Sequence, residues 1–369
     1  MAAVETPART AAKPRGTLAS ATLLALCAGL TLLPVAAEAR DDGQRAALPA
    51  LGAVMDQTST SGISSGAYMA GQFQIAHSSI VVGASIIAGG PYGCAENLLS
   101  DWMWGPSAAF FNMSKAVNGC MLAGMQIWGV PDVQVLAEHT KKLAAAGRID
   151  PLDGLAHDRL YLFSGRNDYT VVPTIVARAA EYYKAVGVPA ANMLVVTDMP
   201  AGHGFITEKQ GNSCQITGAP FVVHCGYDQA GALLAHIYGK LEPAAAEPSG
   251  EFLAYDQKPF VSPDATDHGM SDTGVVYVPR ACREQAGCRV HIAFHGCGQN
   301  RATVGDAFIK ESGYAHWADT NRIVVLFPQV IASPINPQGC WDWWGYTGRD
   351  FLTRSATQIS MVHRMLQRL

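Results

Sequence analysis

Charged side chains are scarce in this sequence, because Asp, Glu, Lys and Arg make up only 15% of its 369 residues. The formal net charge is -4, and no run of five like charges occurs along the chain. Nucleic acids and anionic membrane surfaces attract proteins through clustered Lys and Arg. The sequence therefore offers no electrostatic basis for either partner, and we expect a small or neutral molecule instead.

Long apolar runs are also missing, apart from one near the N-terminus that extends from Leu18 to Ala36. Basic residues precede this run, and Ala37-Glu38-Ala39 follows it. A basic start, an apolar stretch and an A-x-A site are typical of a secretory signal peptide. We predict a signal peptide over residues 1–39, cleavage after Ala39, and a secreted or periplasmic protein. An uncleaved membrane anchor is the alternative, but Pro34 and several small residues make the run marginal for a span.

The nine cysteines become eight if Cys27 is removed with the signal peptide. An even number in an exported chain indicates disulfides. Spacing alone does not determine the connectivity, but the mostly local solution pairs Cys94 with Cys120, Cys214 with Cys225, Cys282 with Cys288, and Cys297 with Cys340. The last pair would join the loop at Cys297 to the Trp-rich segment that begins at Cys340, so that both could form walls of one site.

C-x-x-C pairs, which are typical of structural zinc sites, are absent. Zinc remains an alternative only for a cluster of Cys and His in the second half, namely Cys282, Cys288, His291, His295 and Cys297. Because export favours disulfides, we expect no metal and no cofactor.

No repeat and no separate binding module is recognisable, and 49% of the residues are hydrophobic, enough for a large core. We predict one catalytic domain over residues 40–369, monomeric, with an internal connector near 242–250. Short apolar runs predict strands at 81–88, 160–163, 194–197, 275–278, 290–294 and 323–327, and helical patterns cover 133–146, 175–186 and 307–320. Alternating strands and helices indicate an α/β fold, with a mostly parallel sheet and helices on both faces.

Ser64 is the candidate nucleophile, because Gly62-Ile63-Ser64-Ser65-Gly66 matches the G-x-S-x-G elbow of α/β-hydrolases. A turn that merely reverses the chain is the alternative interpretation. If the elbow forms, the backbone N–H of Ser65 is the first oxyanion donor.

An acid and a base follow Ser64 in the order of an esterase triad. Asp168 comes five residues after a predicted strand, with Asp158 and Asp198 as rivals. His203, in Gly202-His203-Gly204, comes six residues after the next strand and is the best base. We expect His224 and His236 to be ordinary surface or core histidines.

The remaining motif is out of order. Phe294-His295-Gly296-Cys297 is similar to the HG-type loop of esterases, whose backbone N–H completes the oxyanion hole and which normally precedes the nucleophile. Here it follows the triad, so we predict a circularly permuted α/β-hydrolase with the amide of Cys297 as second donor. A nearby aromatic cluster predicts an apolar binding wall, although packing against the sheet is an equal alternative for each ring; its members are Trp341, Trp343, Trp344 and Tyr346.

Together these segments resemble the single-domain, circularly permuted poly(3-hydroxybutyrate) depolymerases, over most of residues 50–369. The resemblance is carried by GISSGAYMA at 62–70, GRND at 165–168, GHG at 202–204, FHGCGQ at 294–299 and GCWDWWGY at 339–346. It implies a serine esterase that cleaves a polyester of (R)-3-hydroxybutyrate or its oligomers through an acyl-enzyme, with Ser64, Asp168 and His203 as triad. A feruloyl or acetylxylan esterase is the alternative within the same chemistry, and an inactive exported binding protein is the alternative from another class.

Overall fold

An eight-stranded sheet lies at the centre of the computed structural model, which describes residues 46–97, 106–122, 128–263, 265 and 267–369. The chain divides into Met1–Gly43 and Gln44–Leu369, and all described residues fall in the second unit. The predicted signal peptide at 1–39 therefore lies outside the described residues. No helix in the described part is both long enough and apolar enough to cross a membrane.

The large sheet is mostly parallel. Its strands are β1 (Thr58–Ile63), β2 (Val81–Ile87), β3 (Arg159–Phe163), β4 (Met193–Val196), β8 (Glu251–Asp256), β9 (Thr273–Val278), β10 (Arg289–Phe294) and β11 (Ile323–Phe327). Their order across the sheet is β4-β3-β2-β1-β10-β11-β9-β8, and only β9 runs antiparallel to its two neighbours. A small parallel sheet of order β5-β7-β6 is built from β5 (Phe205–Thr207), β7 (Val222–His224) and β6 (Asn212–Ser213).

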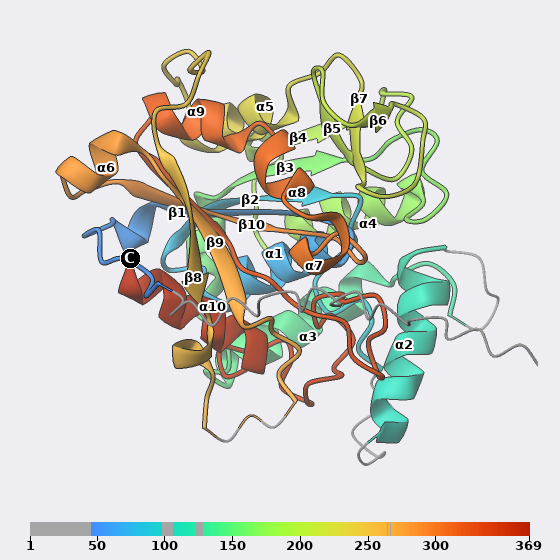
Figure 1. The fold of residues 1–369 in the computed structure, drawn as a ribbon. Helices are drawn as coiled ribbons and strands as arrows, with labels where there is room; N and C mark the ends of the chain where they lie inside the picture. The colour runs from blue at the N-terminus through green and yellow to red at the C-terminus, as the bar shows by residue number, and fades with distance from the viewer. Residues whose placement is uncertain (1–45, 98–105, 123–127, 264, 266) are drawn as a thin grey trace, which may run out of the picture. The chain divides into compact units, whose positions relative to one another are not determined.

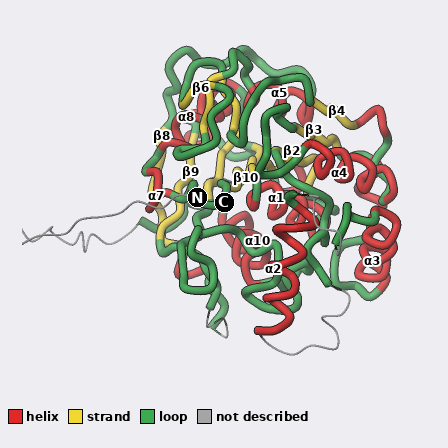
Figure 2. The backbone as a smooth tube through the Cα atoms, turned by 90° about the vertical axis from the view of Figure 1, so that its right-hand side faces the viewer, coloured by secondary structure: helices red, strands yellow, loops and turns green. Residues whose placement is uncertain are grey.

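Helices cover both faces of the large sheet (Figure 1). One face carries α1 (Ser65–Ala76), α3 (Val133–Ala145), α4 (Pro173–Ala185) and α10 (Thr357–Arg368), and the other carries α5 (Gln229–Tyr238), α8 (Ala307–Glu311) and α9 (Tyr314–Thr320). Figure 2 shows α3 and α4 side by side at the end of the first layer. The other helices are α2 (Pro106–Cys120), α6 (Arg280–Glu284) and α7 (Arg301–Val304), with 3-10 turns at Met55–Gln57, Leu152–Ala156, Ala190–Asn192 and Lys258–Phe260.

Alternation along the strands creates the two hydrophobic layers. In β11, Val324 and Leu326 belong to the hydrophobic cluster that includes α1 and α10, whereas Val325 and Phe327 belong to the cluster that includes α5 and α9. All five residues of β11 are buried, as expected for a parallel strand covered on both faces. The sheet is thereby held rigidly, with its carboxyl edge free to carry loops.

The order of the strands confirms the predicted permutation. Counted from β8 and continuing through β1 to β4, the strands lie in the order first, second, fourth, third, fifth, sixth, seventh and eighth. The HG-type loop then follows the third strand, β10, and the G-x-S-x-G elbow follows the fifth, β1, which is the usual hydrolase arrangement. At the seam, the carbonyl of Leu369 accepts hydrogen bonds from the amides of Leu51 (2.6 Å) and Ala53 (3.2 Å).

The predicted strands and helices are present, but one predicted helix is divided, and several elements were not predicted, among them β1, β8, α2, α5 and α10. The helical stretch at 307–320 is broken into α8 and α9 at Gly313, whose φ of 87° lies in the left-handed region. The central strand β1 was not predicted, because its sequence TSTSGI is largely polar and shows no apolar alternation. The predicted connector at 242–250 joins α5 to β8 and contains neither helix nor strand.

Candidate active site

Ser64 occupies a sharp turn between β1 and α1. Its φ of 58° and ψ of -123° are rare for a residue with a side chain and are typical of strain at a functional site. A Cβ on Gly62 would lie 2.1 Å from the carbonyl oxygen of Gly66, and one on Gly66 would lie 2.3 Å from the carbonyl oxygen of Phe294. Both glycines are therefore needed sterically, as the elbow interpretation requires.

Asp168 and His203 meet in the loops after β3 and β4. His203 Nδ1 lies 2.8 Å from Asp168 Oδ2, and both side chains are buried. The other carboxylate oxygen accepts hydrogen bonds from the amides of Thr170 (2.8 Å) and Val171 (2.9 Å), which fixes the carboxylate. An ionised carboxylate only accepts hydrogen bonds, so Nδ1 carries the proton and Nε2 is left to act as a base.

The rivals lie elsewhere. Asp158 is buried before β3, where its Oδ2 accepts a hydrogen bond of 2.6 Å from Gln74, and burial raises its pKa to about 7. Asp198 is exposed. His224 Nδ1 is 3.2 Å from the carbonyl oxygen of Gly211, and His236 Nε2 is 3.0 Å from that of Asn192. Among these candidates, only Asp168 and His203 form a carboxylate–imidazole pair.

The His203 loop is held by the segment that connects β6 to β7 in the small sheet. The amide of His203 donates to the Thr217 hydroxyl (2.9 Å), and the amide of Gly202 donates to the carbonyl of Cys214 (2.9 Å). Cys214 is disulfide-bonded to Cys225, directly after β7. The imidazole is therefore positioned by a crosslinked support.

Ser64 stands apart from this pair in one respect. Among the described residues, its hydroxyl has no hydrogen-bond partner, so the structure does not join it directly to His203. Catalytic hydrogen bonds often tighten only when substrate binds. The loops that carry Ser64, Asp168 and His203 all follow parallel strands at the same edge of the sheet, which is where active sites of such sheets lie.

His295 shapes the loop after β10 without exposing its ring. Its Nε2 accepts from the amide of Val330 (3.3 Å), so Nδ1 carries the proton and donates to the carbonyl of Gly296 (2.8 Å). Burial lowers the pKa of His295 to about 4, so the ring is neutral near pH 7. It is therefore a structural histidine in this arrangement.

Some backbone amides of this loop are hydrogen-bonded within the described part of the protein and others are not. The amide of Gly296 donates to Gln299 Oε1 (2.8 Å), that of Gly298 to the carbonyl of Gln338 (2.7 Å), and that of Gln299 to the carbonyl of Gly296 (3.3 Å). In the described chain, the amides of Cys297 and Ser65 have no such acceptor. Two unpaired backbone donors beside the elbow are what an oxyanion hole requires.

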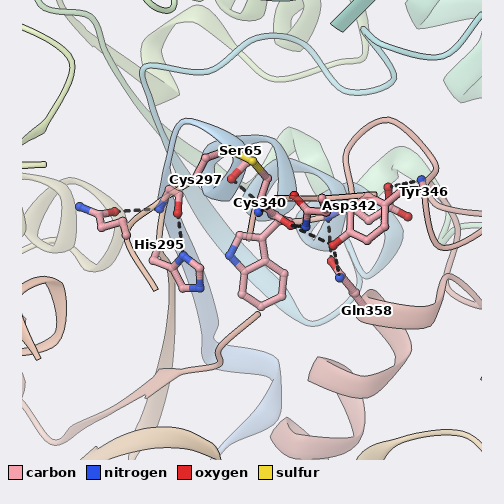
Figure 3. The surroundings of a disulfide bond; sticks show 11 residues. Ser65, His295, Cys297, Cys340, Asp342, Tyr346 and Gln358 are labelled. Atoms are coloured by element: carbon pink, nitrogen blue, oxygen red, sulfur yellow. Dashed lines mark hydrogen bonds between the residues drawn. A yellow bond between two sulfur atoms is a disulfide. The ribbon is translucent and has the colours of Figure 1, made fainter. Parts of the chain in front are cut away.

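One short segment holds both candidate donors (Figure 3). Cys297 is disulfide-bonded to Cys340, and the next residue, Trp341, donates its amide proton to the Ser65 hydroxyl at 3.3 Å. Asn336 exchanges two hydrogen bonds with the backbone of Cys340, at 2.7 and 2.9 Å. The disulfide and the Ser65 hydroxyl therefore tether the two halves of the candidate oxyanion hole to one rigid turn.

The aromatic residues of this segment have different environments. Trp341 is fully buried against Phe294 (ring centroids 4.9 Å apart), so it supports the site from below and has no surface to offer a substrate. Trp343 stacks on Tyr68 with centroids 4.0 Å apart. Trp344 and Tyr346 line a cavity of about 910 Å³.

Asp342 organises the turn that presents these rings. Its carboxylate accepts from the amides of Gly345 (2.7 Å), Tyr346 (2.9 Å) and Thr347 (3.0 Å), and from the Thr347 hydroxyl (2.6 Å). Burial raises the pKa of Asp342, while these hydrogen bonds oppose that rise. The opposite wall of the cavity comes from α2, through Phe110 and Met113.

The structure contains the four predicted disulfides, Cys94–Cys120, Cys214–Cys225, Cys282–Cys288 and Cys297–Cys340. Three cysteines of the zinc alternative are therefore not available as thiolate ligands. Within the described ranges, no three His, Cys, Asp or Glu side chains are grouped as a metal site.

Sequence reasoning missed Gln299, which is buried and contacts both the oxyanion loop and the loop before β7. Its place at the end of FHGCGQ was the only available signal.

Known proteins are similar to this chain in sequence and fold, although no family model matches it. The poly(3-hydroxybutyrate) depolymerase of Delftia acidovorans is 37% identical over 327 residues, which are 87% of this chain but 61% of that protein. The polyhydroxybutyrate depolymerase of Talaromyces funiculosus is 34% identical over 333 residues, covering 86% of this chain and 90% of that protein.

Two solved structures share the fold at 31% identity, each covering 88% of this chain and 98% of its own: a PHB depolymerase complexed with R3HB trimer (TM-score 0.77) and the PHB depolymerase from Penicillium funiculosum (TM-score 0.76). The chain belongs to the poly(3-hydroxybutyrate) depolymerase family.

Proposed function

We propose that this chain is a serine esterase that hydrolyses poly(3-hydroxybutyrate) or its oligomers to 3-hydroxybutyrate units. The observation that carries the proposal is the buried Asp168–His203 pair at the sheet edge that also holds the strained Ser64 elbow. The relative complexed with R3HB trimer supports an oligoester as the substrate.

The mechanism follows from these positions. His203 Nε2 takes the hydroxyl proton of Ser64, and Ser64 Oγ attacks the ester carbonyl. The carbonyl oxygen becomes an oxyanion that accepts hydrogen bonds from the amides of Ser65 and Cys297. When the intermediate collapses, His203 gives the proton to the leaving alkoxide, which departs as the hydroxyl end of the shortened chain.

Deacylation repeats the sequence with water. His203 removes a proton from the water, which attacks the acyl-enzyme, and the proton then returns to Ser64 as the 3-hydroxy acid leaves. Asp168 stays ionised and stabilises the imidazolium that forms in both halves. Trp343, Trp344 and Tyr346 form an apolar wall for the oligoester, with Trp341 supporting them from below.

We also propose that residues 1–39 are a signal peptide cleaved after Ala39, and that 40–369 act as one monomeric catalytic domain, secreted or periplasmic. The four disulfides support export, since such bonds persist in oxidising compartments.

The test uses purified mature protein and its Ser64→Ala variant on amorphous poly(3-hydroxybutyrate), its oligomers, p-nitrophenyl butyrate and a feruloyl sugar ester. We expect polyester and oligomer hydrolysis that the variant loses. Activity confined to the feruloyl ester would replace the substrate assignment, and the absence of any Ser64-dependent hydrolysis would overturn the esterase proposal.

A further inference from the structure

Gln299 bridges two loops of the candidate site that come from distant parts of the chain. Its side chain is only 2% exposed and makes three hydrogen bonds. Oε1 accepts from the amide of Gly296 (2.8 Å), while Nε2 donates to the carbonyls of Pro220 (3.1 Å) and Phe221 (3.0 Å). Because one partner is a donor and two are acceptors, the orientation of the amide group is determined.

On the base side, the bridge ends beside His203. The carbonyl of Phe221 also accepts from the amide of Phe205, two residues after His203, at 2.8 Å. The Phe221 ring meets the imidazole edge-on, with centroids 6.5 Å apart. Phe221 has a φ of 55°, a backbone conformation that is costly for an aromatic residue and needs support from its surroundings.

On the oxyanion side, the Gln299 side chain accepts the hydrogen bond of the Gly296 amide, which could otherwise compete with the Cys297 amide for a substrate oxygen. With the Gly296 N–H held by Gln299, the Cys297 N–H is the loop amide left for a substrate oxygen. The two loops also lie close together, since a Cβ added to Gly298 would lie 3.6 Å from Phe221 Cε2. A single buried amide thus connects the candidate oxyanion donor with the support of the candidate base.

We propose that Gln299 is a positioning residue that holds the oxyanion loop and the His203 loop in their catalytic relationship. It contacts no reacting atom, and it acts through Gly296 and Phe221. This inference rests on the esterase activity proposed above. A displacement of about 1 Å in such a site can cost about 10²-fold in rate, so loss of the bridge acts on turnover more than on binding.

The experiment compares Gln299→Met and Gln299→Glu with the unaltered enzyme on p-nitrophenyl butyrate, with rates normalised to the folded fraction from near-UV circular dichroism. Met removes all three hydrogen bonds, whereas an ionised Glu keeps the acceptor for Gly296 and loses both donors. We expect kcat to fall about 10- to 100-fold in both variants, with KM changed less than about threefold. Inhibition by butylboronic acid, whose serine adduct places an oxygen in the oxyanion hole, should weaken by the same factor.

The pH profile adds a readout that a general packing role would not change. In the Gln299→Glu variant, protonation of the introduced carboxyl restores one O–H donor, and burial raises the pKa of such a carboxyl. The ratio of Gln299→Glu to unaltered activity should therefore rise as the pH falls, while the ratio for Gln299→Met stays constant.

Gln257 provides a matched control. It is also fully buried, and it accepts from the amide of Gln329 (3.0 Å) and donates to the carbonyls of Ser271 (2.6 Å) and Gln329 (2.9 Å), but it bonds neither candidate loop. Gln257→Met should lower thermal stability and leave kcat and boronate inhibition near those of the unaltered enzyme.

Unchanged kcat in both Gln299 variants, a flat pH ratio for Gln299→Glu, or an equal kcat loss in Gln257→Met would overturn the positioning role. None of these outcomes contradicts the proposed function, because the esterase proposal fails only if the unaltered enzyme shows no Ser64-dependent hydrolysis.

Discussion

The amide of Leu51 donates a hydrogen bond of 2.6 Å to the carbonyl of Leu369, at the seam where the permuted chain would be continuous in an ordinary hydrolase. Joining Leu369 to Ala46 through a short Gly/Ser linker and opening the chain within 243–249 should therefore restore the usual strand order. Because a short flexible closure costs little free energy, we expect activity on p-nitrophenyl butyrate within about threefold of the parent. As the control, a permutant opened inside α5 should not fold. If the permutant opened within 243–249 also failed to fold, the proposed position of the seam would be wrong.

Replacing Asp168 with Asn keeps the shape of the side chain but presents an amide to His203 Nδ1. The imidazole then adopts the wrong tautomer, and kcat should fall by about 10⁴-fold while KM changes little. Steady-state kinetics on p-nitrophenyl butyrate measure the effect. Asp198→Asn, at an exposed position in the next loop, should retain full activity; a comparable loss there would reject Asp168 as the triad acid.

Removing the Cys297–Cys340 disulfide should affect both stability and turnover. By chain entropy, a loop of 43 residues is worth about 4 kcal/mol and the 6-residue loop of Cys282–Cys288 about 2 kcal/mol. We expect both double Ser variants to melt at lower temperature, but only the Cys297/Cys340 variant to lose kcat, by about tenfold or more, because its loop carries a candidate oxyanion donor. Equal kcat in the two variants would show that the disulfide is purely a stabilising crosslink.

Trp344 lines the 910 Å³ cavity, whereas Trp317 lies on α9 with its indole N–H bonded to Asp228 (2.7 Å). Trp344→Ala should raise KM for a 3-hydroxybutyrate trimer about tenfold, equivalent to about 1.4 kcal/mol of lost binding. The KM for p-nitrophenyl butyrate, which has a single ester and no further monomer units to contact the wall, should change less than about twofold. As the control, Trp317→Phe should change neither KM. If Trp344→Ala kept the wild-type KM for the trimer, Trp344 would not be part of the binding wall.

Buried histidines make stability depend on pH. His77 stacks on His363 with centroids 4.2 Å apart, near Asp150 and Arg354, and its pKa is lowered to about 3, first by burial and then by His363. The unfolded chain takes up this proton near pH 6.5 and the folded chain only near 3, so stability is complete above about 6.5 and is lost as the pH falls toward 3.

Each such histidine steepens this loss by up to about 1.4 kcal/mol per pH unit. His77→Gln should therefore flatten the decline in the unfolding free energy between pH 6.5 and 4, measured by urea denaturation. His224→Gln, at an exposed position, should follow the parent curve. Parallel curves for parent and His77→Gln would show that His77 does not drive the acid sensitivity.

Buried apolar strands were largely predictable from the sequence, whereas α5 and α10 were not predicted, although their buried residues recur at helical spacing. The largely apolar run of β10 and the fully apolar run of β11 were predicted closely, since a strand covered on both faces is mostly apolar. The central strand β1 was not, because its buried Ser and Thr hydroxyls are satisfied by distant partners, such as Ser61 with Tyr314 at 2.6 Å. Such bonds exist only after folding, so no local pattern reports them.

The sequence by itself determined which chemistry-bearing segments exist and the order in which they occur, and their unusual order predicted the permutation. Only the tertiary structure decided which side chains reach one another: Asp168 with His203, Trp341 with Phe294, and Gln299 with Phe221, which is 78 positions away. The reason is physical. A motif depends on local backbone geometry, which neighbouring residues impose, whereas these contacts depend on how the sheet brings the ends of separate strands to one edge.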